Sequence, residues 1–208
     1  MHTLFLKNNN INQAIEILKS GGIGIFPTDT VYGIGCDFSN TVSLNNLYKA
    51  KVRDYSKPIN ILVSRKDMIY KYVKNVSSIE ETLINKFWPG PLTIIFNKTD
   101  LVPDLLTSGL NTVGIRMPNN KVCLDLIDTL GKPLATSSAN ISNEEPTNYI
   151  NENLIKKFKN KVDFILDFGK IDSGISSTII KVENNKINIL REGPISFNDI
   201  MEVINNVR

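Results

Sequence analysis

The stretch Pro133-Leu134-Ala135-Thr136-Ser137-Ser138-Ala139-Asn140 changes character halfway along its length. Its first residues are apolar and typical of a strand that packs in a core. The hydroxyl and amide side chains that follow have little bulk to pack, but they form hydrogen bonds readily and let a ligand approach the backbone closely. The stretch therefore indicates either a Ser/Asn-rich turn after a strand or the edge of a site for an anionic ligand.

Two other segments favour the binding site. Pro27-Thr28-Asp29-Thr30-Val31-Tyr32-Gly33 follows residues 21–26, which read as a buried strand entered through a glycine turn. Lys51-Val52-Arg53 stands at the end of an expected helix. Lysine supplies a compact point charge, and arginine supplies a planar fork for phosphate or carboxylate. We expect the three segments to meet in a pocket for an anion.

Length, composition and charge limit the kinds of protein that this chain can be. The chain has 208 residues, 41% of them hydrophobic, which suits one globular domain over residues 1–208. The net charge of +3 suits anionic ligands but is too small to argue for nucleic acid. Cys36 and Cys123 lack metal-ligand spacing, so we expect free thiols. His2 is the single histidine and is close to the start of the chain, which excludes Ser-His and Cys-His nucleophiles and zinc sites built on histidine.

Hydropathy argues against a membrane protein. No apolar run approaches the ~20 residues that a membrane span needs. The beginning of the chain turns polar at Asn8-Asn9-Asn10, before the apolar part of a secretion signal could form. We expect a cytoplasmic protein.

Helical and strand-like patterns alternate along the chain, which predicts an α/β fold. Strands are expected at residues 22–26, 59–63, 92–96, 112–116, from 133, at 162–166, 177–182 and 186–191. Helices are expected at residues 11–18, from residue 43, at 78–87, 122–130, 154–158 and 196–207. Asn10 and Ser196 are the expected caps of the first and last helix, and a capping box is expected to open the helix at Ser78. Because Glu183-Asn184-Asn185 predicts a hairpin, the sheet should be mixed, with flanking helices.

With these segments in order, the chain resembles the YrdC/Sua5 family, the threonylcarbamoyl-AMP synthases. Any one of the shared motifs would be weak, but eight in the same order with similar gaps are specific. The motifs are Pro27–Gly33, Lys51-x-Arg53, Lys57-Pro58, Trp88–Thr93, Gly114–Pro118, Ser137–Ser142, Ser177–Ile180 and Leu190–Gly193.

The resemblance implies a fold and a reaction. The fold is a single-domain twisted mixed sheet with flanking helices and a large basic concave cavity. The reaction joins L-threonine, bicarbonate and ATP into threonylcarbamoyl-AMP and releases pyrophosphate. The product serves N6-threonylcarbamoyladenosine formation in tRNA, so threonylcarbamoyl transferase machinery is the expected downstream partner. The chain looks like the short form, without the separate C-terminal domain of some members.

For the ATP side of the cavity, the resemblance singles out five residues. Lys51 and Arg53 are expected at the triphosphate as the main catalytic charges, with Lys57 as a minor contact. Ser138 and Asn140 are expected to bind the nucleotide or the carbamate. The alternatives are a solvated helix end for the first pair and a simple turn for the second.

Arg191 is also expected at the nucleotide, with a surface salt bridge as its alternative. Thr30, Tyr32, Arg116 and Ser177 are expected around the threonine. Tyr32 could instead be a core aromatic, and Arg116 could form an internal ion pair with an aspartate.

The chemistry needs no protein nucleophile, because a carbamate oxygen formed from threonine attacks the α-phosphate of ATP. The protein must hold two anions together and neutralise the developing charge. Mg²⁺ is expected with ATP, and the phosphates should supply most of its ligands because no carboxylate cluster marks a protein site. Asp29 is equally open to a structural and a catalytic role. Leu62 stands where some family members have a histidine.

Two other functions fit the same basic cavity. A relative without synthase activity could bind RNA there, since such a surface also suits a phosphate backbone. A carbamoyl-transfer module like that of hydrogenase maturation proteins would lie in a longer chain with zinc-finger-like cysteines, which this sequence lacks. The presence of both halves of the expected pocket favours the synthase.

Overall fold

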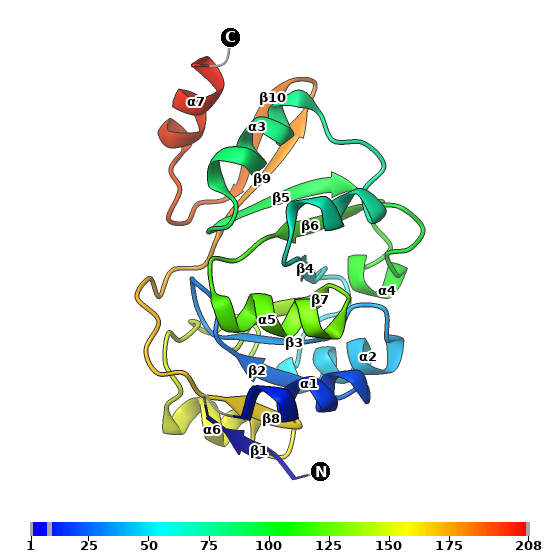
Figure 1. The fold of residues 1–208 in the computed structure, drawn as a ribbon, viewed down its shortest axis with the longest axis vertical. Coiled ribbons are helices and arrows are strands. Elements are labelled where there is room, and N and C mark those ends of the chain that lie inside the picture. The colour runs from blue at the N-terminus through cyan, green and yellow to red at the C-terminus, as the bar shows by residue number, and fades with distance from the viewer. Residues whose placement is uncertain (1, 8–9, 207–208) are drawn as a thin grey trace.

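The computed structural model describes residues 2–7 and 10–206. All its named strands join one ten-stranded mixed sheet in the order β1-β8-β2-β3-β7-β4-β6-β5-β9-β10 (Figure 1). The strands are β1 (Leu4–Leu6), β2 (Gly24–Phe26), β3 (Gly33–Asp37), β4 (Asn60–Leu62), β5 (Leu92–Asn97), β6 (Thr112–Arg116), β7 (Leu134–Ser138), β8 (Phe164–Leu166), β9 (Thr178–Glu183) and β10 (Lys186–Arg191). The predicted α/β class and mixed sheet are confirmed.

Helices flank this sheet, as the alternating pattern predicts. In Figure 1, α5 and α1 lie in front of the middle strands, and α3 lies in front of the strands near the C-terminal edge. The helices are α1 (Ile11–Lys19), α2 (Thr41–Lys51), α3 (Ser78–Phe87), α4 (Asp104–Thr107), α5 (Lys121–Leu130), α6 (Glu152–Phe158) and α7 (Phe197–Asn205), with a 3-10 helix η2 (Lys66–Lys71). Helix α1 packs on α5, and α3 packs on α7.

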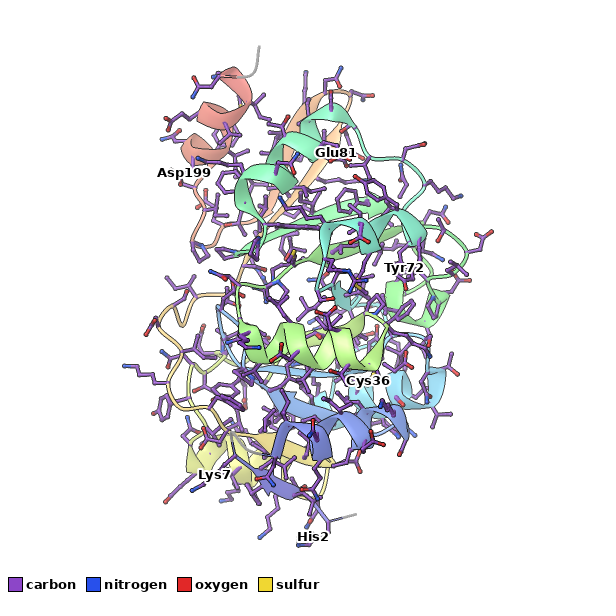
Figure 2. The ribbon with its side chains drawn as sticks, in the orientation of Figure 1. His2, Lys7, Cys36, Tyr72, Glu81 and Asp199 are labelled. Atoms are coloured by element: carbon purple, nitrogen blue, oxygen red, sulfur yellow. The ribbon has the colours of Figure 1, made fainter. Side chains whose placement is uncertain are left out.

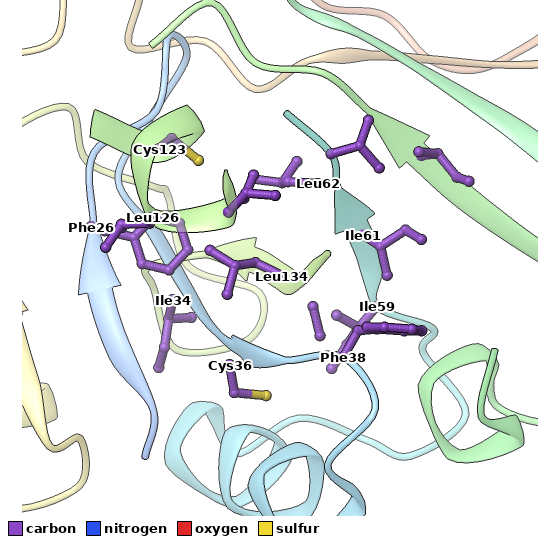
Figure 3. Packing of buried hydrophobic residues seen from close by; sticks show 14 of the residues in the cluster. Phe26, Ile34, Cys36, Phe38, Ile59, Ile61, Leu62, Cys123, Leu126 and Leu134 are labelled. Atoms are coloured by element: carbon purple, nitrogen blue, oxygen red, sulfur yellow. The ribbon is translucent and has the colours of Figure 1, made fainter. Parts of the chain in front are cut away.

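Apolar side chains from both layers form the core. Figure 3 shows Leu126 of α5 beside Phe26 of β2 and Leu134 of β7, and all three are fully buried. Side chains alternate between the two faces of a strand, so residues two apart share a face. On β5, Leu92, Ile94 and Phe96 of one face are all buried, whereas on the other face Thr93 is buried, Ile95 is partly exposed and Asn97 is exposed. This second face carries the polar residues of the central strands.

Several elements differ from the sequence prediction. Strand β3 was not predicted, because all its residues are buried and it shows no alternation. A Cβ at its Gly35 would lie 2.4 Å from the Ala135 carbonyl oxygen, so only glycine fits there. Strand β1, helix α4 and helix η2 were also missed; they are short and carry weak patterns.

The helix starts show why two boundaries moved. Helix α2 begins at Thr41 rather than Ser43, because the Asn40 side chain accepts the Ser43 amide and caps the helix. The capping box of α3 is Ser77 with Glu80, one residue before the predicted position. The Ser196 cap of α7 is confirmed, and Val207 lies outside the described residues.

Three predictions from composition can also be checked. Cys36 and Cys123 are free and buried. His2 is exposed at the N-terminal end of the molecule, whereas Cys36 lies in its interior (Figure 2). Among the described residues, no helix has the length and apolar character that a membrane crossing needs.

Candidate functional site

A cavity of about 470 Å³ lies on the polar face of the central strands. Side chains of β4, β5, β6 and β7 that share this face line it, including Asn60, Thr93, Arg116 and Ser138. Loops and the end of β10 complete the wall. The predicted site residues that line it are Thr30, Arg53, Lys57, Arg116, Ser138, Ser177 and Arg191. The fold thus brings together residues from seven separate stretches of the chain.

The cavity wall is basic. It contains Arg53, Lys57, Arg116 and Arg191, and no aspartate or glutamate lies among the residues that line it. This composition confirms the expected basic concave cavity. A concave, positively charged wall concentrates the electrostatic potential and attracts anions.

Backbone carbonyl groups orient two of the cavity arginines. Arg53 donates from Nε to the Lys57 carbonyl oxygen at 3.0 Å and from Nη2 to that of Pro58 at 2.8 Å. Arg191 donates from Nε and Nη2 to the Ser177 carbonyl oxygen at 3.0 and 2.8 Å. Burial lowers the pKa of both guanidinium groups, and the nearby Arg116 charge also lowers that of Arg191. Within the described residues neither arginine has a carboxylate partner, so both charges are free to meet a ligand.

Arg116 differs, because it forms a buried ion pair with Asp29. Its Nη1 lies 2.8 Å from Asp29 Oδ1, and the two side chains are only 7% and 11% exposed. This pair is the internal ion pair that the sequence left open as an alternative. Arg116 still lines the cavity, so it can be held by Asp29 and face a ligand at the same time. Asp29 Oδ2 is buried and finds no hydrogen-bond donor among the described residues.

Hydroxyl groups surround the arginines. Ser177 Oγ lies 2.9 Å from Thr93 Oγ1 and accepts a 3.2 Å hydrogen bond from Arg191 Nη2. Thr30 Oγ1 lies 3.0 Å from Thr28 Oγ1. Hydroxyls can both donate and accept, so this part of the wall suits a polar molecule that offers both kinds of group.

Lys51 does not line the cavity, contrary to expectation. Its side chain is 1% exposed, and its Nζ donates to the carbonyl oxygens of Ser138 and, at 2.6 Å, Asn140. The ammonium is therefore held by the loop that follows β7 and is not part of the cavity wall. Burial, and then the Arg53 charge, lowers the pKa of Lys51 to about 7, although the Glu144 charge opposes this.

Asn140 and Tyr32 also lie outside the cavity wall. The Asn140 side chain donates to the carbonyl oxygens of Ile141 and Glu144 at 2.9 and 2.7 Å, so it shapes its own loop. Tyr32 is a fully buried core aromatic, and its hydroxyl donates to the Gly169 carbonyl oxygen at 2.7 Å. Burial raises the pKa of Tyr32 to about 12.

Sequence reasoning missed several lining residues. Asn60 and Thr93 share the cavity face of their strands, and Thr136, Ser137 and Ser176 stand beside residues that were predicted. The period of two within the strands could have identified Asn60 and Thr93 once the cavity face was known. Leu62 also lines the cavity, so an apolar side chain occupies this part of the wall. The described residues hold no group of three or more histidine, cysteine, aspartate or glutamate side chains that could bind a metal.

Known proteins share this sequence and fold. The Sua5/YciO/YrdC family model, described as telomere recombination, matches residues 16–193. A threonylcarbamoyl-AMP synthase of Pyrococcus abyssi is 32% identical over 198 residues, which is 95% of this chain but only 58% of that protein. A Methanocaldococcus jannaschii protein, provisionally named threonylcarbamoyl-AMP synthase, is 38% identical over 194 residues, or 91% of this chain and 90% of the relative.

A solved structure agrees with the sequence comparison. The crystal structure of P. abyssi Sua5 complexed with L-threonine superposes with a TM-score of 0.93 at 30% identity, over 97% of this chain and 61% of that one. The chain thus spans less than two thirds of this relative. The match of family model, sequence and fold leads to one conclusion: the chain belongs to the Sua5/YciO/YrdC family.

Proposed function

We propose that this protein is an L-threonylcarbamoyladenylate synthase, which condenses L-threonine, bicarbonate and ATP to threonylcarbamoyl-AMP and pyrophosphate. The observation that carries the proposal is the cavity wall, where four basic residues and several hydroxyls converge without any acidic residue. The names of the relatives support the same activity.

The cavity has two kinds of anion site. Arg53, Lys57 and Arg191 have no carboxylate within ion-pair distance in the described chain, so they suit the polyanionic triphosphate, with Ser138 beside them. Arg116 is already partly neutralised by Asp29, so it suits a single carboxylate such as that of threonine. Thr30 and Ser177 line the wall and can bond the amino acid. Lys51, Asn140 and Tyr32 do not contact the ligands directly in this proposal.

These positions explain how the cavity would promote the reaction. The threonine carbamate oxygen attacks the α-phosphorus, and the bond from that phosphorus to the bridging oxygen of pyrophosphate breaks. Two anions must approach each other for this step, so the protein contributes by placing them and by offsetting their repulsion. Arg53 and Arg191 are held by backbone carbonyls before the ligand arrives, so little reorganisation is needed.

Magnesium enters this scheme as part of the substrate. The described residues offer no cluster of ligating side chains, and the cavity wall has no carboxylate. A magnesium ion therefore fits the site only as Mg·ATP, with phosphate and water oxygens as its ligands.

The product is a mixed anhydride of a carbamate and a phosphate, which water hydrolyses readily. An enzyme that takes up the threonylcarbamoyl group must therefore follow. We propose the tRNA-modifying threonylcarbamoyl transferase machinery as this consumer, in the cytoplasm.

The test is pyrophosphate release from Mg·ATP, measured with and without L-threonine and bicarbonate. Release that requires both co-substrates supports the synthase. ATP binding without release would refute it, and RNA binding in the same cavity would then be the next measurement. An Arg53→Met variant is the control for activity from contaminants, since its release at low ATP concentration should fall with its weaker ATP binding.

A further inference from the structure

Lys51 and Asn140 form hydrogen bonds with the loop after β7, and neither lines the cavity. Lys51 is the last residue of α2, and its Nζ donates to the carbonyl oxygens of Ser138 and Asn140. The Ser142 amide donates in return to the Lys51 carbonyl oxygen at 3.1 Å. Helix α2 and this loop are therefore joined by both side-chain and backbone hydrogen bonds.

Ser138 is the member of this network that reaches the cavity. Its hydroxyl donates to Asn140 Oδ1 at 2.5 Å, and Asn140 Nδ2 donates to the Glu144 carbonyl oxygen at 2.7 Å. Lys51 Nζ also lies 3.5 Å from Asn140 Oδ1. The position of the Ser138 hydroxyl thus depends on a chain of hydrogen bonds that starts at the Lys51 ammonium.

The buried charge of Lys51 is poorly compensated. No carboxylate lies within ion-pair distance of its Nζ in the described part of the chain. The charged groups that act on it are Arg53, which disfavours the ammonium, and the more weakly acting Glu144, which favours it. A buried ammonium is costly without a partner, and a bound phosphate in front of the loop would stabilise it.

We propose that Lys51 is a positioning residue, whose ammonium holds the Ser138–Asn140 turn in the shape that binds the nucleotide, without itself touching phosphate. This inference rests on the proposed function, because it assumes that the cavity binds ATP. The proposal assigns different roles to the two members of each pair, Lys51-x-Arg53 and Ser138-x-Asn140. Arg53 and Ser138 face the ligand, and Lys51 and Asn140 fix the loop.

The first test is a double-mutant cycle on ATP binding, measured by calorimetry so that no turnover is needed. Lys51→Met keeps the length of the side chain and removes its charge, and Ser138→Ala removes the hydroxyl. We expect each variant to weaken ATP binding about tenfold, and the double variant to be no weaker than the worse single one. Threonine binding should not change. Losses that multiply in the double variant, or unchanged ATP binding in Lys51→Met, would overturn the proposal.

The second test uses pH and does not depend on the folding of Lys51→Met. Burial lowers the pKa of Lys51 to about 7. As the pH rises above 7, a growing share of the ATP-free protein therefore carries a neutral Lys51 amine, which cannot support the loop as the ammonium does. Between pH 7.5 and 9.5, ATP affinity of the wild type should fall, by no more in all than the about tenfold loss expected for Lys51→Met. Arg53 keeps its charge over this range. Lys51→Arg, which stays charged, should show a flat profile.

A flat profile in the wild type would overturn the role of the ammonium. A different result would refute the proposed function alone. If the protein binds ATP with the expected pH dependence but releases no pyrophosphate, it is not the synthase, and the role of Lys51 in ATP binding still stands. Absence of ATP binding by the wild type would refute both.

Discussion

Asp29→Asn is the substitution that best examines the amino-acid side of the cavity. It keeps the size of the side chain and removes the charge that faces Arg116 at 2.8 Å. Both side chains are almost fully buried, so the guanidinium would be left without its carboxylate in a place that water reaches poorly. Removing one partner of a buried pair costs about 3–5 kcal/mol.

One feature of the site lowers this estimate. Arg116 borders the cavity, where water can solvate part of its charge, so we expect a loss below that range, about 2–3 kcal/mol. For a chain of this size, that corresponds to a fall in Tm of roughly 5–10 °C. Threonine should also bind more weakly, because Arg116 loses the group that orients it, whereas ATP binding should be unchanged.

The assay is urea unfolding combined with the threonine dependence of pyrophosphate release. Asp125→Asn is the matched control, because Asp125 pairs with Lys121 at a similar 2.7 Å but both side chains are exposed, at 43% and 86%. We expect the control to cost less than ~0.5 kcal/mol. An Asp29→Asn protein as stable as the control, with unchanged threonine dependence, would refute the reasoning about burial and about Arg116.

Three further predictions concern the nucleotide side and the fold. Arg53→Met should raise the KM for ATP at least ~tenfold and leave that for threonine unchanged, whereas Arg65→Met, which removes an exposed arginine paired with Asp128, should change neither; steady-state kinetics measures both. Gly24→Ala would place a Cβ about 2.1 Å from the Phe164 ring and should lower the free energy of unfolding by about 1–3 kcal/mol, measured by urea unfolding. The double variant Gly24→Ala/Phe164→Leu should recover part of this loss, and no recovery would argue against this clash. Ser77→Ala should cost about 1 kcal/mol because it removes the cap of α3, and Ser78→Ala should cost less than ~0.5 kcal/mol; the reverse order would place the cap at Ser78.

Local patterns in the sequence predicted most helices and strands. The amphipathic face with Ala14, Ile15 and Leu18 and the alternation around Ile61 each fix an element within a few neighbouring residues. Strand β3 escaped because burial of every residue removes the alternation that marks a strand. Strand order also depends on distant segments, and no local pattern encodes it.

In the site too, local motifs could be predicted from the sequence, whereas contacts between distant segments could not. Seven of the expected residues line the cavity: Arg116, Ser138 and Arg191 end strands, Thr30 follows a strand, and Arg53, Lys57 and Ser177 lie shortly before strands. Lys51 was expected at the triphosphate, with a solvated helix end as the alternative, and its burial was not foreseen. Its partners, the carbonyls of Ser138 and Asn140, lie 87 and 89 residues away in the chain, and backbone acceptors leave no trace in a sequence. The Arg116–Asp29 pair also spans 87 residues, so the sequence could offer it only as one of two roles.

The most direct measurement is mass spectrometry of the product formed from Mg·ATP, L-threonine and ¹³C-labelled bicarbonate by the purified protein. We predict threonylcarbamoyl-AMP that carries one labelled carbon, disappears when threonine is omitted, and decreases at low ATP concentration when Arg53 is changed to Met or at low threonine concentration when Arg116 is changed to Met. An unlabelled adenylate, or no adenylate from a protein that binds both ATP and threonine, would contradict it.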